Sequence, residues 1–246
     1  MSSRVVVVTG ALTGIGRATA EAFADIGDVV VVAGRHRAVG EELAMQLNDR
    51  GAPKAVFVET DVRFEDQVAH LVETTVGEFG SLDVAVNSAG LDGELGLIRD
   101  VTVEQYRAIH DTNVLGTLLS LKHQLRAMQK QRSGAIVNVS SLYGLRGTPN
   151  VSVYAASKHA VIGLTRTAAL EAAEYGVRVN AVAPGYTDTP MLDRVAGDNR
   201  DRFEGEVPLG RIASPAETAL AITYLSGPGA SYVTGQVLPV DGGLSA

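Results

Sequence analysis

The chain has 246 residues, 46% of them apolar and 20% charged, a formal net charge of −7 and no cysteine. This composition predicts a folded globular chain, with residues 1–246 forming one large α/β domain. It argues against nucleic acid or membrane as partner and excludes disulfides, thiol catalysis and thiolate metal sites, and we assign no metal ligands. The apolar run after Arg4 is too short for a signal peptide or a membrane span, so we expect a cytoplasmic protein.

The chain begins with a glycine-rich turn between a strand and a helix. Residues 5–8 are a β-branched run typical of a strand buried on both faces, and residues 17–23 have helical character. Between them the chain reads Thr9-Gly-Ala-Leu-Thr-Gly-Ile-Gly16. Glycines let the backbone approach a pyrophosphate, and free amides at a helix N-terminus attract it. A purely structural turn is the alternative, but the flanking strand and helix favour a dinucleotide site that includes Gly10, Thr13, Gly14, Ile15 and Gly16.

The second strand, residues 29–33, ends at Gly34-Arg35-His36-Arg37. In a dinucleotide site this end meets the adenosine ribose, where a carboxylate suits NAD and a basic group suits the 2′-phosphate of NADP. We therefore favour NADP(H) over NAD(H), with Arg35 as the main phosphate contact and Arg37 as a second one. The alternative is that both arginines are solvated residues at the start of a helix, because Thr13 supplies no second cation.

Helices and strands continue to alternate with short links, which predicts a Rossmann-type doubly wound parallel sheet of about seven strands with helices on both faces. After the third strand, Asp61-Val62 is placed to meet the adenine, although Asp61 also suits the N-cap of the next helix. The expected strands are 55–58, 82–86, 134–139, 177–182 and 237–240, and the expected helices 38–50, 64–79, 102–111, 114–131, 152–175 and 216–225.

Asn113 interrupts the helical region 102–131 and needs a specific hydrogen-bond partner, or else it marks a kink that bonds its own backbone. On the helix 152–175 we expect small residues to form a subunit interface, because they permit close helix approach. The residues concerned are Ala156, Ala160, Leu164, Ala168 and Ala172.

The chemistry is expected between Ser141 and Lys158. Tyr154 and Lys158 lie four residues apart, so in a helix they share one face. A fixed ammonium beside a phenol favours the phenolate and lowers its pKa, which makes Tyr154 an acid or base near neutrality. Ser141 follows a buried strand, at the sheet edge where open α/β sheets carry out their chemistry. Taken alone, the Tyr-x-x-x-Lys pair is also common by chance.

Beyond the sixth strand, Pro184-Gly-Tyr-Thr-Asp-Thr-Pro190 leads into residues 190–208, whose apolar residues lack clean periodicity. Such a segment is typical of a mobile lid over a site. The expected walls of the substrate pocket are largely apolar with two aromatic rings, which suits a ketone of moderate size. They are Leu142, Tyr143, Leu145, Asn150, Val151, Tyr186 and Met191, with residues 92–95.

Along its whole length the chain resembles the short-chain dehydrogenase/reductase family. The resemblance rests on the Thr9–Gly16 turn, Asp61-Val62, Asn87-x-Ala89-Gly90, Asn113, Ser141, Tyr154-x-x-x-Lys158, and Pro184-Gly185 with Thr189, all in family order. It implies a nicotinamide cofactor and a homotetramer. Two departures are Ser88, where many members have asparagine, and Thr187, where an aliphatic residue is common.

The resemblance also implies a role for each matching residue. Tyr154 becomes the acid in carbonyl reduction and the base in alcohol oxidation, and Ser141 binds the same oxygen. Lys158 holds the nicotinamide ribose, and Asn113 fixes a water leading to solvent. The remaining matches would line the cofactor, namely Asn87, Ala89, Gly90, Pro184, Gly185, Thr187 and Thr189.

These expectations define an NADP(H)-dependent carbonyl reductase or secondary-alcohol dehydrogenase acting on a small molecule. A 3-oxoacyl-acyl-carrier-protein reductase is the alternative within this class. Docking an acidic carrier requires a basic rim, however, and the arginines of residues 190–211 are interleaved with carboxylates. A non-catalytic NADP(H)-binding protein is a further alternative, although none of the four tetrad positions is degraded.

Overall fold

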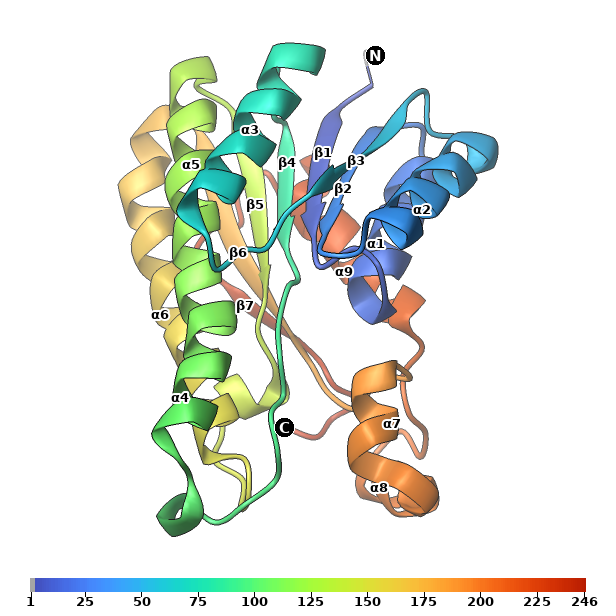
Figure 1. Ribbon diagram of the computed structural model, residues 1–246, viewed down its shortest axis with the longest axis vertical. Coiled ribbons are helices and arrows are strands. Elements are labelled where there is room, and N and C mark those ends of the chain that lie inside the picture. The colour runs from blue at the N-terminus through green and yellow to red at the C-terminus, as the bar shows by residue number, and fades with distance from the viewer. Residues whose placement is uncertain (1–2) are drawn as a thin grey trace.

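A seven-stranded parallel sheet forms the centre of the computed structural model, which describes residues 3–246 except for the side chain of Asp198 (Figure 1). The strand order is β3-β2-β1-β4-β5-β6-β7, and every neighbouring pair is parallel. The strands are β1 (Val5–Thr9), β2 (Val29–Gly34), β3 (Ala55–Glu59), β4 (Val84–Asn87), β5 (Gly134–Val139), β6 (Val177–Pro184) and β7 (Val237–Val240). The predicted doubly wound fold is confirmed.

Helices cover both faces of the sheet, because successive strand residues point to opposite sides. Val6 and Val8 of β1 pack towards α1 (Gly14–Asp25), α2 (Arg37–Arg50) and α9 (Pro215–Ser226). Val7 packs on the other side, towards α3 (Glu65–Phe79), α5 (Gly116–Gln131) and α6 (Ser152–Ala172). Both faces of β1 are therefore buried, as its unbroken β-branched run predicts.

The chain order reverses between β1 and β4, which are neighbours in the sheet. Such a reversal opens a crevice at the carboxyl ends of the strands, where ligands bind in open α/β sheets. α4 (Val103–His110) lies on one side of this end of the molecule, and α7 (Pro190–Ala196) and α8 (Arg200–Glu206) lie on the other (Figure 1). The lid predicted at 190–208 is thus largely helical.

The break at Asn113 is a π-helical turn, Asp111–Leu115, between α4 and α5. It places Asn113 inside the molecule, 1% exposed. Among the helices described within residues 3–246, none is long and apolar enough to cross a bilayer.

Two local predictions are wrong. Ala168 and Ala172 of α6 pack in the core under the sheet, so they do not belong to an outward alanine row. Asp61 does not cap α3, because Phe64 precedes that helix and Asp61 pairs with Arg63 at 2.5 Å. The alanines are drawn into the core by packing against the sheet, whereas Asp61 is held by a local ion pair with Arg63 in the loop before α3.

Candidate active site

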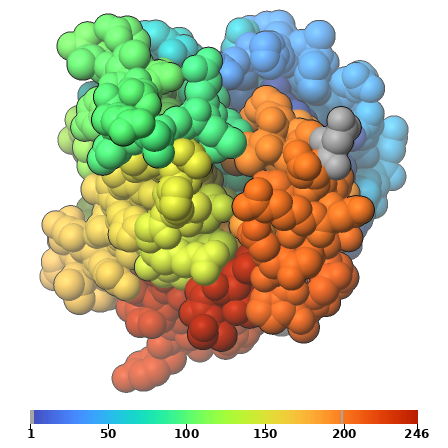
Figure 2. Space-filling model, turned by 90° about the horizontal axis from the view of Figure 1, so that it is seen from below, coloured from blue at the N-terminus to red at the C-terminus, as the bar shows by residue number. Residues whose placement is uncertain are grey.

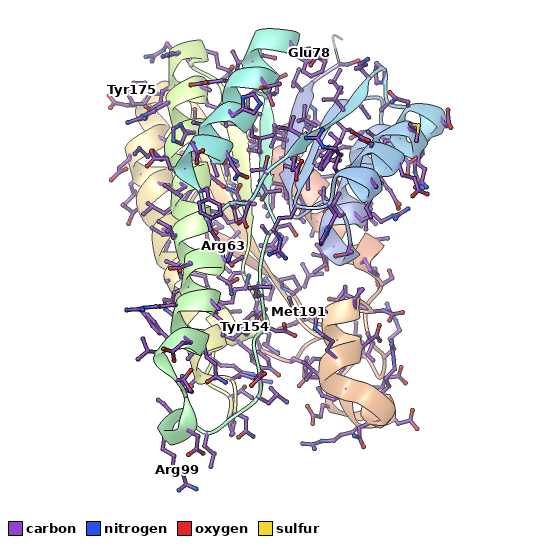
Figure 3. The ribbon with its side chains drawn as sticks, in the orientation of Figure 1. Arg63, Glu78, Arg99, Tyr154, Tyr175 and Met191 are labelled. Carbon is purple, nitrogen blue, oxygen red and sulfur yellow. The ribbon has the colours of Figure 1, made fainter. Side chains whose placement is uncertain are left out.

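One continuous cavity of about 910 Å³ runs along the carboxyl ends of the strands. It extends from Arg35 at the end of β2 to Tyr154 on α6 and to the lid helices. Figure 2 shows the lid, in orange, facing the green and yellow-green segments across a groove, and Figure 3 shows Tyr154 and Met191 at the same end of the sheet. The volume lies at the upper end of the range for small-molecule sites, which leaves room for a cofactor and a substrate.

Most of the predicted site residues line this cavity. They are Gly10, Thr13, Gly14, Ile15, Gly16, Arg35, Asp61, Val62, Ala89, Gly90, Ser141, Tyr154, Lys158, Pro184, Gly185, Thr187 and Thr189. Asn87 and Asn113 lie behind its wall. The Asn87 amide donates to Gln124 Oε1 at 3.0 Å and to Asn138 Oδ1 at 2.9 Å, so this side chain supports the end of β4 from below.

The glycine-rich turn has the geometry of a phosphate cradle. Gly10 has a φ of 65°, and a Cβ placed there would lie 2.6 Å from the Ala89 amide nitrogen. Only glycine fits such a position without displacing the backbone. α1 begins within the turn, at Gly14, and Thr13 makes no side-chain capping bond. The first amides of α1 are therefore available to an anion such as a pyrophosphate.

The two arginines after β2 have different surroundings. Arg35 lines the cavity and forms no ion pair with the carboxylates that the structure describes. Arg37 lies outside the cavity wall and pairs with Glu59 at 2.8 Å. Among the described residues, Arg35 therefore offers an unpaired guanidinium at the β2 end of the cavity, and the second contact expected from Arg37 is not supported.

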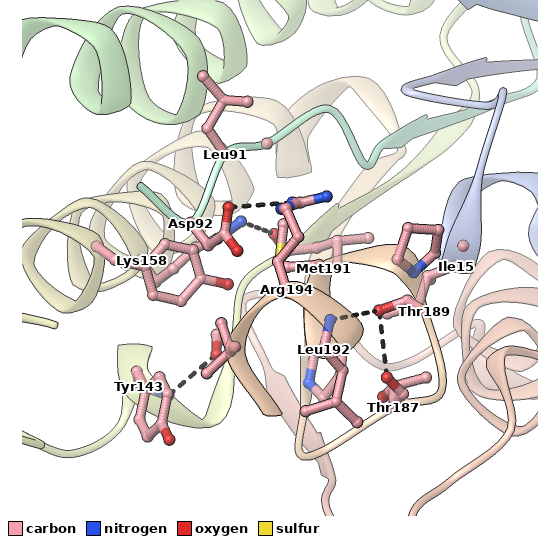
Figure 4. A pocket seen from close by; sticks show the side chains of 18 of the residues that line it. Ile15, Leu91, Asp92, Tyr143, Lys158, Thr187, Thr189, Met191, Leu192 and Arg194 are labelled. Atoms are coloured by element: carbon pink, nitrogen blue, oxygen red, sulfur yellow. Dashed lines mark hydrogen bonds and ion pairs between the residues drawn. The ribbon is translucent and has the colours of Figure 1, made fainter. Parts of the chain in front are cut away.

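Tyr154, Ser141 and Lys158 come together at the other end. Ser141 Oγ accepts a hydrogen bond from the Tyr143 amide at 3.2 Å, so its own proton can be donated to the neighbouring Tyr154 oxygen or to a ligand in the cavity. Lys158 Nζ donates to the Val139 carbonyl at 3.0 Å and lies 5.6 Å from the centre of the Tyr154 ring. Figure 4 shows Lys158 on one side of the pocket and Met191 and Arg194 of α7 towards the other.

Burial controls the titration of both groups. It raises the pKa of Tyr154 to about 12, an effect that a hydrogen bond to Ser141 opposes and the Asp92 carboxylate reinforces. Burial also lowers the pKa of Lys158 to about 8. The lowered tyrosine pKa expected from the Tyr-x-x-x-Lys pair is therefore wrong for this protein, because desolvation of the phenolate is the largest effect.

Asn113 joins three segments of the chain. Its Oδ1 accepts from the Leu91 amide at 2.7 Å, and its Nδ2 donates to the Leu91 carbonyl at 2.8 Å and to Ser157 Oγ at 2.9 Å. Gly90, in the same loop, lies close to both side chains, because a Cβ added to it would lie 3.3 Å from Lys158 Nζ and 3.4 Å from Asn113 Oδ1. Asn113 thus holds the loop after β4 against α6, and its expected role in fixing a water stays a prediction.

Thr189 connects the cofactor turn to the lid. Its hydroxyl accepts from the Leu192 amide at 3.4 Å and donates to the Thr187 carbonyl at 3.2 Å, so it caps α7. A Cβ at Gly14 would lie 3.0 Å from Thr189 Cγ2. A ligand in the glycine-rich turn therefore reaches the start of the lid.

Several residues of the site were not predicted from the sequence. Arg146 lines the cavity, Ser157 bonds Asn113, and Ser140 Oγ donates to the Lys158 carbonyl at 2.9 Å. No local pattern marks them, because their partners lie far away along the chain. Two residues predicted to line the substrate pocket do not line it. Leu142 is buried in the core, 1% exposed, and Leu145 is 36% exposed outside the cavity.

Comparisons with known proteins agree with this geometry. Residues 10–245 match the family model described as enoyl-(acyl carrier protein) reductase. The chain is 44% identical to cis-4-hydroxycyclohexanecarboxylate dehydrogenase of Sinomonas cyclohexanicum, over 100% of this chain and 98% of the relative. It is 38% identical to the 3-oxoacyl-acyl-carrier-protein reductase FabG of Chlamydia muridarum, over 99% of this chain and 98% of the relative. A solved structure of ElxO with NADP bound has a TM-score of 0.92 and 34% identity, covering 99% of both chains.

The burial of Lys158 predicts a stabilising substitution at the site. The folded state carries the full desolvation penalty below about pH 8, and the penalty disappears between about pH 8 and 10.5 as the folded state loses its proton first. We expect Lys158→Met to raise the free energy of unfolding by about 1 to 3 kcal/mol at pH 7, after allowing for the lost bond to Val139. The gain should shrink from about pH 8 and be lost by about pH 10.5.

Urea denaturation at a series of pH values measures this difference, and Lys130→Met, at an exposed lysine of α5, is the matched control. A loss of stability on Lys158→Met that is equal at pH 7 and pH 11 would contradict the expectation.

Proposed function

Because the chain belongs to the short-chain dehydrogenase/reductase family of oxidoreductases, we propose that it is an NADP(H)-dependent enzyme that interconverts a ketone and a secondary alcohol. The observation that carries the proposal is the single cavity in which a phosphate cradle, a free arginine and the Ser141-Tyr154-Lys158 group lie in line. When bound there, NADPH would supply the hydride, and residues of the chain would bind and protonate the substrate oxygen.

Tyr154 is the proton donor to that oxygen. With a pKa of about 12 the phenol is protonated at neutral pH, which is the form that donates a proton in carbonyl reduction. The Ser141 hydroxyl donates a hydrogen bond to the same oxygen as negative charge develops on it. Lys158, protonated at pH 7 with a pKa of about 8, stabilises the phenolate that remains.

Arg35 supports NADP(H) as the cofactor. It is the free guanidinium at the adenosine end of the cavity, and a planar guanidinium matches a phosphate with two parallel hydrogen bonds. The bound NADP of the similar ElxO structure agrees with this choice.

The substrate we propose is a cyclic ketone or alcohol of about one six-membered ring. The wall beyond Tyr154 is largely apolar and contains three further aromatic rings, Tyr143, Tyr186 and Phe203. The relative from Sinomonas cyclohexanicum acts, by its name, on an alcohol of a cyclohexane ring.

A 3-oxoacyl-acyl-carrier-protein reductase is the second candidate, favoured by the 38% identity to such an enzyme. Its acidic carrier needs a basic surface near the cavity. Arg200 pairs with Asp188 at 2.6 Å and Arg211 with Glu217 at 2.7 Å. Arg194 and Arg202 are likewise paired with carboxylates. The rim is therefore mostly neutralised, which supports the small-molecule substrate.

The first test is turnover of a panel of ketones with NADPH by the parent protein and by Tyr154→Phe. Loss of the proton donor should lower kcat by about 10²- to 10⁴-fold while NADPH binding persists. A Tyr154→Phe variant with the parent kcat would contradict the mechanism. A parent that binds NADPH but reduces no ketone would favour the non-catalytic alternative.

The second test concerns the cofactor. Arg35→Ala should weaken NADPH binding about 10- to 100-fold, because a charge-assisted contact is lost, and should leave NADH binding unchanged. Arg37→Ala is the matched control, since Arg37 lies outside the cavity and pairs with Glu59. Titration of cofactor fluorescence measures both. Equal affinity of the parent for NADPH and NADH would overturn the assignment.

We also propose that the protein is a homotetramer. We place it in the cytoplasm, because an acidic chain without cysteine suits a reducing compartment. Exposed apolar side chains on and beside α5 and α6 support subunit contacts, among them Leu118 at 45% and Leu170 at 83% exposure. Light scattering should give the mass of four chains for the parent. The double variant Leu118→Glu/Leu170→Glu should dissociate, and a monomeric parent would rule the assembly out.

A further inference from the structure

A charged pair at the substrate end of the cavity has no part in the proton transfer described above. Asp92, in the loop after β4, accepts a hydrogen bond from Nη2 of Arg194 on α7 at 3.1 Å (Figure 4). Both residues line the cavity. The Asp92 side chain is 16% exposed and that of Arg194 58%.

We propose that Asp92 and Arg194 form a polar subsite that binds a second hydroxyl group of the substrate. The preferred substrates are then hydroxyketones and the corresponding diols, rather than simple ketones or oxo acids. This inference rests on the proposed function, because it names the substrate class of the same cavity.

The pair is fixed in place from both sides. Asp92 follows Leu91, whose amide and carbonyl are both held by the side chain of the buried Asn113, at 2.7 and 2.8 Å. Arg194 lies on α7, which Thr189 caps and Pro190 begins. A subsite on such anchored elements loses little entropy when a ligand binds.

The pair also has unused hydrogen-bonding capacity. Its one bond joins Asp92 Oδ1 to Arg194 Nη2. A carboxylate accepts through two oxygens, and a guanidinium carries five N–H donors. An acceptor and several donors therefore remain side by side at the cavity wall. A hydroxyl group both donates and accepts, so it matches the two at once.

The charge of the Asp92–Arg194 pair favours a hydroxyl over a carboxylate as the second polar group of the substrate. Asp92 and Arg194 together are electroneutral, so a neutral hydroxyl meets no net repulsion. A substrate carboxylate would meet the Asp92 anion, which lies close enough to Tyr154 to reinforce the raised pKa of the phenol. Two other polar groups of this wall are already paired, since Tyr186 donates to Glu206 at 2.7 Å and Arg202 bonds the same carboxylate at 3.3 Å.

The test compares three ketones with NADPH: 4-hydroxycyclohexanone, cyclohexanone and 4-oxocyclohexanecarboxylate. For the parent we expect kcat/KM for the hydroxyketone to exceed that for cyclohexanone by about 10- to 100-fold, the value of a hydrogen bond to a charged group. In Asp92→Ala this ratio should fall towards one, while cyclohexanone is still reduced.

Asp193→Ala is the matched control. Asp193 also pairs with an arginine of the lid, Arg200 at 2.7 Å, but it lies outside the cavity wall. This variant should keep the parent ratio, which separates loss of the subsite from a general disturbance of α7.

The outcomes distinguish this inference from the proposed function. Reduction of cyclohexanone with a parent ratio near one, or a ratio unchanged by Asp92→Ala, would overturn the subsite alone. Preference for the oxo acid over the hydroxyketone would overturn it too, and would assign the anion to Arg194 and Arg146. If the parent reduces none of the three ketones and no other ketone of the panel, the proposed function itself fails.

Discussion

The buried ammonium of Lys158 is the constraint on which the surrounding structure depends. It is 4% exposed, bonds the carbonyl at the end of β5, and has no carboxylate partner among the described residues. Removing a charge from water costs stability unless other groups compensate, so the pKa of this lysine falls to about 8. The same burial keeps the phenol of Tyr154 protonated. A proton donor and a cation that can stabilise its conjugate base are thus held together at the expense of stability, as is common at active sites.

Asn113 connects this charge to the substrate side of the cavity. The π-helical turn brings one amide side chain into contact with the loop after β4 and with Ser157 on α6. Gly90 leaves the space that Lys158 and Asn113 occupy, and Asp92 follows two residues later. The Tyr154–Lys158 pair and the loop that carries Asp92 therefore depend on one hydrogen-bonded junction. A substitution at Asn113 is expected to affect both together.

The sequence was most informative where local chemistry acts alone. The β-branched strands and the turn between β1 and α1 were predicted correctly, and Tyr154 and Lys158 lie on one helix that lines the cavity, because each feature depends on residues close together in the chain. The errors share another cause. Ala168 and Ala172 pack against the sheet instead of facing outwards, and Arg37 pairs with Glu59 instead of lining the cavity. The pKa of Tyr154 is raised instead of lowered. Each of these depends on how much water or which partner the fold places beside the group.

By itself, therefore, the sequence determined the class of fold, the glycine-rich turn before α1 and the placement of Tyr154 and Lys158 on one face of a helix. Parallel strands, tight turns and helical faces follow from short-range steric and periodic rules. Only the tertiary structure decided the protonation of those side chains and the composition of the substrate wall. Asp92 and Arg194 are 102 residues apart in the chain and 3.1 Å apart in the fold. The fold places α7 beside the loop after β4 and so brings the two residues together across the cavity, which no local pattern encodes.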